Sequence, residues 1–203
     1  MIYTVALTGN IASGKTEVAN YLQQYDITII DADIIAKELL TSDSKIIQTI
    51  IGHFGSKILL QNGQIDRRKL REIIFNNKDE KIWLENLLHP IIRSKIKTIQ
   101  QNAVGLYCVL VIPLLNDKNQ HHYHFDSICL VKTSKDSQLK RIMLRDNVDI
   151  SMAESVIKQQ INAQEKLLNI SYVIENTRTL LDLENQANIL HEKLLITIKN
   201  NKN

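Results

Sequence analysis

Residues 9–16 read GNIASGKT, which fits the pattern G-x-x-x-x-G-K-[ST] of a phosphate-binding loop. Residues 2–7, just before it, form a short run with a high β-propensity, whereas residues 17–22, just after it, have apolar side chains at helical spacing. Strand, glycine-containing loop and helix in this order are the context that the motif requires. The stretch therefore predicts a site for the phosphates of a nucleotide.

The residue types of this loop suit phosphate binding. Backbone N–H groups in such a loop converge on phosphate oxygens, and the start of the following helix adds partial positive charge. Lys15 can reach the β- and γ-phosphates, and the Thr16 hydroxyl can bind Mg²⁺. A chance match in a glycine- and serine-containing loop is the alternative, and the two correct flanks argue against it. We expect nucleotide contacts from Gly9, Asn10, Ile11, Ala12, Ser13, Gly14, Lys15, Thr16 and Glu17.

The composition indicates a globular protein with one α/β domain. The chain has 203 residues, 44% hydrophobic and 23% charged, with a formal net charge of +3. Its densest basic stretch, residues 67–71, has apolar residues at helical spacing, which favours a solvated helix face over a nucleic-acid surface. One Trp and three Phe also argue against a surface that stacks on bases.

The cysteines and the apolar segments bear on the compartment. Cys108 and Cys129 lie inside apolar runs and are expected to be core thiols of a reduced protein. The longest apolar stretch, residues 103–115, is too short to span a bilayer and contains Pro113. The N-terminus lacks the basic region of a secretory signal. We expect a cytoplasmic protein with no membrane partner.

Five short apolar runs predict strands, and helical patterns separate them. The runs are continuous instead of alternating, which suits a parallel sheet buried on both faces. Together with the phosphate loop they predict an α/β fold, a P-loop NTPase core whose five-stranded parallel sheet is flanked by helices. The predicted strands are residues 2–8, 27–31, 106–112, 127–131 and 172–174.

A helical insert separates the second and third predicted strands. Residues 34–104 are far more than one crossover helix needs, and they are well placed to hold a second substrate. Helices are expected over residues 34–40, 45–54 and 67–75, capped by Asp33, Ser44 and Asp66, and over residues 78–101 as one or two helices interrupted near His89-Pro90.

A second polar, helical segment, residues 134–170, is expected to form a lid beside the loop. We expect its helices to break at residues 146–149 and to restart with a capping box of Ser151 and Glu154. The single domain would then consist of the insert, the lid and a core made of residues 1–33, 105–133 and 171–203.

Two acids, Asp31 and Asp33, follow the second predicted strand. They would lie at the carboxyl edge of the sheet, where the phosphate loop also opens. One could deprotonate an attacking hydroxyl and the other could hold Mg²⁺-bound water. The alternative is that Asp33 only caps a helix and Asp31 only solvates the strand end. The third strand ends in Pro113 and offers no rival acid, which favours the functional interpretation.

Arg141 and Arg145 are four residues apart on a predicted helix and so share a face. Their guanidinium groups match phosphate oxygens, although they could instead pair with Asp146 or Glu154 on a solvated helix. The phosphate loop favours the functional interpretation.

The histidines point less clearly to a site. His89 could be a helix cap, a buried donor or a substrate contact. For His121, His122 and His124 an exposed loop is favoured over a metal site, because no cysteine or carboxylate lies at ligand spacing.

Taken together, these segments resemble the dephospho-coenzyme A kinase family over nearly the whole chain. The resemblance is carried, in order, by VALTGNIASGKTEVA at residues 5–19, IIDADIIA at 29–36, GQIDRRKLR at 63–71, LLHP at 87–90, VIPLL at 111–115, QLKR at 138–141 and VIEN at 173–176. Asn10 and Ala12 depart from the family, which usually has Gly at both positions.

The resemblance implies ATP-dependent, Mg²⁺-assisted phosphorylation of the 3′-hydroxyl of dephospho-coenzyme A, the last step of coenzyme A synthesis. It implies a P-loop kinase core, a coenzyme-A-binding insert and a lid. Asp33 would activate the hydroxyl, Lys15 and Arg141 would clamp phosphates, and Thr16 would bind Mg²⁺. Further ATP contacts would come from Arg145 and from Asn176, the latter near adenine. Substrate contacts would come from Thr8, Asp31, Asp33, Arg67, His89 and Pro113.

One alternative stays open within enzymes, another P-loop kinase of a hydroxylated metabolite, similar to a shikimate or gluconate kinase. A GTPase switch is not favoured, because no base-reading N-K-x-D motif follows a strand. The expected partner is a small-molecule substrate, with no nucleic acid, and the chain would be a monomer or a weak homo-oligomer.

Overall fold

The computed structural model describes residues 2–113, 115–164, 167 and 169–201. By internal contacts the chain divides into two compact units, Met1–Asp31 with Lys97–Asn203, and Ala32–Ile96.

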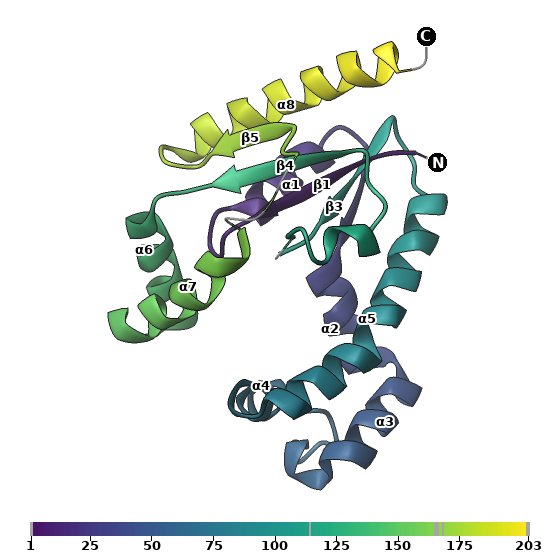
Figure 1. Cartoon of the computed structure of the whole chain (residues 1–203), viewed down its shortest axis with the longest axis vertical. Coiled ribbons are helices and arrows are strands. Elements are labelled where there is room, and N and C mark those ends of the chain that lie inside the picture. Colours follow the sequence, from purple (N-terminus) through teal and green to yellow (C-terminus); the bar gives the residue numbers. More distant parts are fainter. Residues whose placement is uncertain (1, 114, 165–166, 168, 202–203) are drawn as a thin grey trace. The chain divides into compact units, whose positions relative to one another are not determined.

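The first unit is built on a five-stranded parallel sheet of order β2-β3-β1-β4-β5 (Figure 1). All five strands expected from the sequence are present, with ends within one residue of the expected positions. Parallel neighbours such as β1 and β3 need long crossover connections, which accounts for the helices between them. The strands are β1 (Tyr3–Gly9), β2 (Thr28–Asp31), β3 (Tyr107–Val111), β4 (Ser127–Lys132) and β5 (Tyr172–Glu175).

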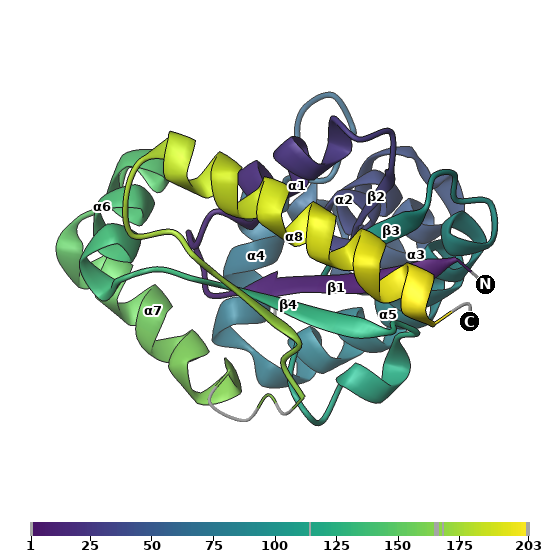
Figure 2. The same cartoon turned by 90° about the horizontal axis from the view of Figure 1, so that it is seen from above.

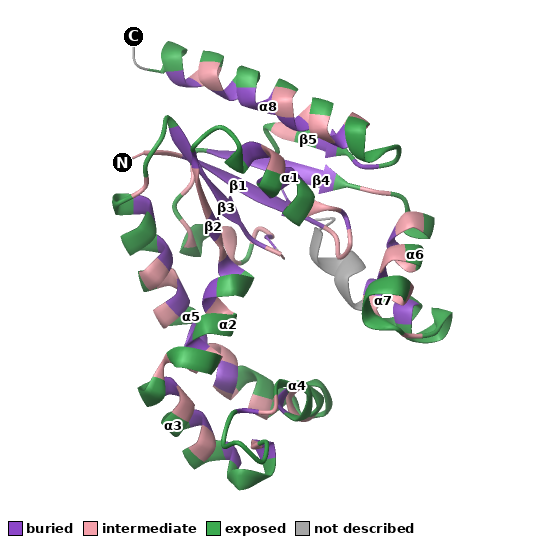
Figure 3. Ribbon diagram, turned by 180° about the vertical axis from the view of Figure 1, so that it is seen from behind, coloured by how far each residue is buried: buried purple, intermediate pink, exposed green. Residues whose placement is uncertain are grey.

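Both faces of the central strands are buried (Figure 3). Helices α1 (Lys15–Gln23) and α8 (Leu180–Asn200) lie side by side over one face (Figure 2). Their apolar side chains pack on alternate strand residues, as a sheet with buried faces requires. This core includes Val5, Leu7, Val18, Leu22, Tyr107, Val109, Cys129, Val131, Leu183, Leu190 and Leu194.

A buried histidine links α8 to the sheet. The His191 Nδ1 is hydrogen-bonded to the Tyr107 hydroxyl at 2.8 Å, and the Tyr25 ring stacks on the imidazole with centroids 3.7 Å apart. His191 is only 8% exposed, and this burial lowers the pKa of its imidazole. The folded state therefore holds His191 neutral more strongly than the unfolded chain does.

The segment between β4 and β5 holds α6 (Lys135–Asp146) and α7 (Ile150–Gln164). The helices break where the sequence predicted, at Asn147, whose φ of 52° is left-handed. The predicted capping box is wrong. α7 begins at Ile150, two residues earlier than a cap at Ser151 requires, and the Asp149 carboxylate accepts the Met152 N–H at 2.8 Å. A capping box does occur at the start of α8, between Thr179 and Asp182.

The second unit contains α2 (Ala32–Ser42), α3 (Ser44–Phe54), η1 (Ser56–Ile58), α4 (Arg67–Asn76) and α5 (Lys78–Gln101) up to Ile96. Asp66 caps α4 as predicted, accepting from the N–H groups of Arg68 and Lys69. Two other predicted caps are wrong. The cap of α3 is Asp43, since Ser44 is already helical, and α2 begins at Ala32, so Asp33 lies in its first turn.

α5 is one continuous helix through Pro90, not two helices interrupted near His89. Pro90 has no N–H for the helical bond and crowds the preceding turn, which is why a break was expected. A stripe of buried residues on both sides of the proline accounts for the continuity, because an apolar face outweighs one lost hydrogen bond. The stripe is Leu84, Leu88, Ile92 and Ile96, each four residues from the next.

The cysteines behave as the sequence predicted. Cys108 and Cys129 are buried free thiols, and burial raises the pKa of Cys129 to about 12. Among the helices of the described residues, none combines the length and the hydropathy needed to span a membrane.

The neutral, buried His191 should make the protein acid-sensitive. Its pKa is lowered on folding, so its contribution to stability is present above the pKa of the unfolded chain, about 6.5, and is lost as pH falls below it. His191→Gln should cost roughly 1–3 kcal/mol of unfolding free energy at pH 7.5 through the unpaired Tyr107 hydroxyl. The substitution should also make the unfolding free energy fall less steeply between pH 7.5 and pH 5.0.

Chemical denaturation at several pH values measures both effects. His121→Gln is the matched control, because His121 is exposed and its removal should leave the pH profile unchanged. If the unfolding free energy of His191→Gln depended on pH as steeply as that of the wild type, His191 would not be the source of the acid sensitivity.

Candidate active site

The phosphate loop joins the end of β1 to the start of α1, in the strand–loop–helix order that the sequence predicted. Two glycines of the loop are required by close contacts. A Cβ on Gly9 would collide with the carbonyl oxygen of Val131 on β4, and one on Gly14 would collide with Nδ2 of Asn176. Gly14 also has a φ of 97°, which other residues rarely adopt. The glycines therefore allow the loop to lie directly against neighbouring strand ends.

The Lys15 ammonium lies over the loop. Its Nζ donates to the carbonyl oxygens of Gly9 at 2.8 Å and Asn10 at 3.0 Å. Lys15 is also the first residue of α1, where backbone N–H groups carry partial positive charge. Phosphate oxygens at this loop would thus meet an ammonium and a helix N-terminus together.

Arg141 reaches the loop from α6. Its Nη1 donates to the carbonyl oxygen of Ala12 at 3.0 Å, and its Nη2 donates to Oδ1 of Asn176 at 3.1 Å. Asn176 in turn donates from Nδ2 to the carbonyl oxygen of Ser13 at 2.8 Å. The structure thus joins residues that are far apart in the chain, and it places Asn176 against the loop backbone. Sequence reasoning missed this contact, and its one signal was a polar residue directly after the last strand.

Arg145 is placed differently from Arg141. Its guanidinium donates through Nε and Nη2 to the two carboxylate oxygens of Asp146, both at 2.8 Å. This carboxylate raises the pKa of Arg145. The pairing with Asp146 that the sequence left open is therefore present, whereas Arg141 is hydrogen-bonded to the loop.

Asp31 lies at the sheet edge from which the loop leaves. In the strand register it is opposite Val111 of β3, which is opposite Leu7 of β1. Asp33 follows two residues later, in the first turn of α2, near the positive end of the helix dipole.

Thr8 and Pro113 lie on the chain segments around this edge. Thr8 is fully buried, and its Oγ1 accepts the backbone N–H of Leu115 at 3.3 Å. Its hydroxyl therefore holds the segment after β3, close to the half-buried Pro113.

One of the two departures within the loop, Ala12, has a structural consequence. Ala12 adopts a left-handed φ of 56°, which costs a residue with a Cβ about 1 kcal/mol. Ile11 and Ala12 also pack against the small apolar cluster of α6 and α7, formed by Ile142, Ala153 and Ile157. The apolar contact offsets part of the backbone cost and links the loop to both helices.

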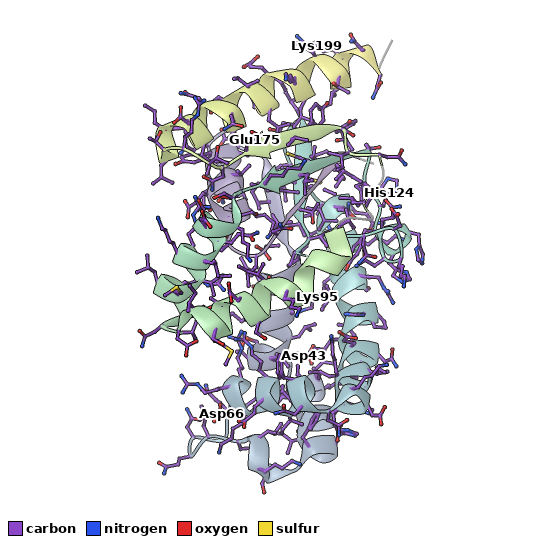
Figure 4. All side chains as sticks on the ribbon, turned by 60° about the vertical axis from the view of Figure 1, so that its left-hand side comes forward. Asp43, Asp66, Lys95, His124, Glu175 and Lys199 are labelled. Carbon is purple, nitrogen blue, oxygen red and sulfur yellow. The ribbon has the colours of Figure 1, made fainter. Side chains whose placement is uncertain are left out.

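The second unit contains a cavity of about 370 Å³, within the size range of small-molecule pockets. Arg67 lines it from the first position of α4, next to the capping Asp66 labelled in Figure 4. His89 is exposed on α5 and does not line it. The remaining lining is mixed apolar and polar and comprises Leu40, Thr41, Ile47, Leu60, Gly63, Gln64, Ile65 and Asp66.

A larger hollow of about 510 Å³ in the first unit is not the candidate site. It is lined by Tyr3, Leu106 and Asp126, which stand at or just before the amino ends of β1, β3 and β4. Ligands of open parallel sheets bind at the carboxyl ends of the strands, where the loop lies.

The residues around η2 (Gln120–His122) match the expectation of an exposed loop, since His121, His122 and His124 are all exposed. Among the described residues there is no group of three or more histidine, cysteine or carboxylate side chains that could hold a metal ion.

Comparison with known proteins shows which family the chain resembles. A family model described as dephospho-CoA kinase matches residues 3–182. A dephospho-CoA kinase of Legionella pneumophila is 43% identical over 196 residues, which cover 96% of each chain.

Solved structures separate the family from the wider fold. A dephospho-CoA kinase from Campylobacter jejuni has a TM-score of 0.67 at 30% identity, covering 94% of this chain and 96% of that one. A shikimate kinase from Acinetobacter baumannii has a TM-score of 0.54 at 15% identity, covering 100% of this chain and 96% of that one, a likeness of fold alone. The family match and the 43% identity over almost the whole length place this chain in the dephospho-CoA kinase family.

Proposed function

We propose that this protein transfers the γ-phosphoryl group of ATP to the 3′-hydroxyl of dephospho-coenzyme A, giving coenzyme A and ADP. The observation that carries the proposal is the family match over residues 3–182, which includes the phosphate loop, Arg141 and the whole helical second unit. The likeness to shikimate kinase extends to the fold alone and gives the rival reaction no comparable support.

Lys15 and Arg141 would stabilise the transferring phosphoryl group. Phosphoryl transfer requires positioning and neutralisation of negative charge more than covalent participation by the protein. Lys15 lies over the loop carbonyls and Arg141 lies at Ala12, so two cations flank the loop that would hold the phosphates. Both are held by hydrogen bonds, which reduces the cost of reorganising them during the reaction.

Asp33 would accept the proton of the attacking hydroxyl. A carboxylate can act as such a base, and Asp33 lies in the first turn of α2, near the positive end of the helix dipole. Asp31, at the carboxyl end of β2, would orient the same hydroxyl or metal-bound water.

The donor set fits a Mg²⁺ ion that arrives with ATP. Mg²⁺ in nucleotide sites is held by one or two protein oxygens, the phosphates and water, so no cage of several carboxylates is needed. The Thr16 hydroxyl in the first turn of α1 is such an oxygen. When bound, the ion would neutralise charge on the phosphates.

The cavity of the second unit would receive part of the acceptor. Dephospho-coenzyme A carries a diphosphate and a long arm with two amides, which suit Arg67 and the mixed lining of the cavity. Residues 134–170 would act as a lid, with α6 carrying Arg141. Residues 165, 166 and 168 of this segment lie outside the described residues.

Lys15→Ala should lower kcat by roughly 10²–10³-fold, because it removes an oriented cation that faces the developing charge. The fold should persist, since the side chain lies on the loop and not in the core. Steady-state assays of ADP release measure the loss. Lys199→Ala, on α8 (Figure 4), is the matched control and should retain full activity. Equal turnover in the two variants would refute the role of Lys15.

Asp33→Asn should lower kcat by roughly 10²–10⁴-fold with little change in ATP affinity, as expected for the loss of one positioned base. Stability should fall by no more than about 1 kcal/mol, the contribution of one charge at a helix N-terminus. Asp43→Asn is the matched control, because Asp43 is also an acid at a helix start but caps α3. If Asp33→Asn lost stability while turnover persisted, Asp33 would have only a structural role.

Acceptor specificity tests the function itself. In assays with ATP and Mg²⁺, kcat/KM should be far higher for dephospho-coenzyme A than for adenosine or shikimate, because remote contacts help position the 3′-hydroxyl. Arg67→Ala should lower kcat/KM for dephospho-coenzyme A roughly tenfold or more through a lost charge-assisted bond, and should leave adenosine unaffected.

Lys81→Ala is the control for a lost exposed cation in the same unit. A preference for shikimate or adenosine would refute the proposed reaction. If Arg67→Ala kept the wild-type kcat/KM for dephospho-coenzyme A, only the role of Arg67 would be refuted.

A further inference from the structure

We propose that Asn176 is a positioning residue for phosphoryl transfer. Its side-chain amide orients the Ser13–Gly14 peptide of the phosphate loop and the guanidinium of Arg141 together. This inference rests on the proposed function, since it assumes that the loop and Arg141 bind phosphates.

Asn176 is buried and all four of its polar groups are used. It is 3% exposed. Its backbone N–H donates to the Lys132 carbonyl at 2.7 Å, and its carbonyl accepts from the Thr133 hydroxyl at 2.6 Å. The backbone of Asn176 is therefore anchored where β4 and β5 end. A buried side-chain amide whose oxygen and nitrogen are both hydrogen-bonded has one preferred orientation.

The donor half of the amide sets the direction of a loop peptide. Nδ2 donates to the carbonyl oxygen of Ser13 at 2.8 Å. A trans peptide holds its C=O and the following N–H on opposite sides. Fixing the Ser13 carbonyl toward Asn176 therefore turns the N–H of Gly14 away from it. That N–H belongs to the loop whose amides would cradle phosphate oxygens.

The acceptor half of the amide holds Arg141. Oδ1 accepts from Nη2 at 3.1 Å, while Nη1 of the same guanidinium donates to the Ala12 carbonyl at 3.0 Å. Two bonds to one planar fork fix its orientation as well as its position. Asn176 thus connects Ser13 to Arg141, and both contacts depend on where β5 ends.

Only an amide of this length fits the position. A carboxylate could accept from Arg141 but could not donate to Ser13, and its second oxygen would face the Ser13 carbonyl. The absence of a Cβ at Gly14 makes room for Nδ2, so the glycine and the asparagine depend on each other. A residue that only filled space would not require both a donor and an acceptor.

The test compares Asn176→Ala, which removes both bonds, with Asn176→Asp, which keeps the shape and the acceptor. ADP affinity is measured by calorimetry, and kcat and KM by steady-state kinetics. We expect both variants to bind ADP at least several-fold more weakly and to lose kcat on the order of tenfold or more. The KM for dephospho-coenzyme A should change less than twofold. A general loss of folded protein would also leave this KM unchanged, but the protein that remained folded would bind ADP with wild-type affinity.

A double-mutant cycle with Arg141→Ala tests the link. If Asn176 acts partly through Arg141, the two losses should not multiply. The fold-loss in kcat of the double variant should be at least five times smaller than the product of the two single fold-losses. The control is Gln186→Ala. Gln186 bonds the backbone N–H and C=O of Glu175, the last residue of β5 (Figure 4), both at 2.9 Å, but does not touch the loop. It should retain ADP affinity.

Each outcome is decisive. Multiplicative losses in the cycle of Asn176→Ala with Arg141→Ala overturn the inference. If Asn176→Ala does not fold, wild-type ADP affinity in Asn176→Asp overturns it. Impaired Arg141→Ala with unimpaired Asn176 variants also overturns this inference alone. A silent Arg141→Ala refutes the clamp role of Arg141 in the proposed function, and with it the part of this inference that concerns the guanidinium.

Discussion

β1 is hydrogen-bonded in parallel to β3 along one side and to β4 along the other, and this pairing determines where its carboxyl end lies. Gly9, the last residue of β1, is opposite Val131 of β4, close enough that a Cβ would collide with the Val131 carbonyl. The loop therefore leaves from the middle of the sheet. β2 is also parallel to β3, so Asp31, its last residue, lies at the same carboxyl edge of the sheet. The positions of the phosphate loop and of this acid follow from one pattern of backbone pairing.

The loop is stabilised by its own carbonyl groups and by the cations around it. Carbonyl oxygens of Gly9 and Asn10 accept from Lys15, and that of Ala12 accepts from Arg141. Each bond to a charged donor is stronger than a neutral one. Each also fixes the peptide whose N–H points the other way, so the same interactions that hold the loop orient its donors. The contacts that stabilise the loop are therefore the same contacts that would prepare it to bind phosphate.

Apolar packing reaches the same loop from α6 and α7. Ile11 and Ala12 contact the cluster of Ile142, Ala153 and Ile157, although Ala12 has the left-handed backbone that glycine adopts more easily. A glycine at position 12 would relieve the backbone and lose a methyl contact. The opposing terms are each about 1 kcal/mol, so alanine is tolerable here. The contact ties the backbone of the loop to the helices that carry Arg141.

Local patterns in the sequence determined the strands, the phosphate loop and the break at Asn147, because each depends on neighbouring residues. Continuous apolar runs report burial on both faces, and G-x-x-x-x-G-K-[ST] reports a backbone shape. Helix starts were less certain: Asp43 replaced Ser44, Asp149 replaced Ser151, and α2 began one residue before Asp33. Several polar side chains near a helix start compete to cap it, and small differences in backbone geometry decide among them. Only the tertiary structure decided that α5 runs through Pro90, that Arg145 pairs with Asp146 while Arg141 reaches the loop, and that Asn176 supports both Ser13 and Arg141. These outcomes depend on burial and on contacts between distant segments, which no pattern of neighbouring residues records.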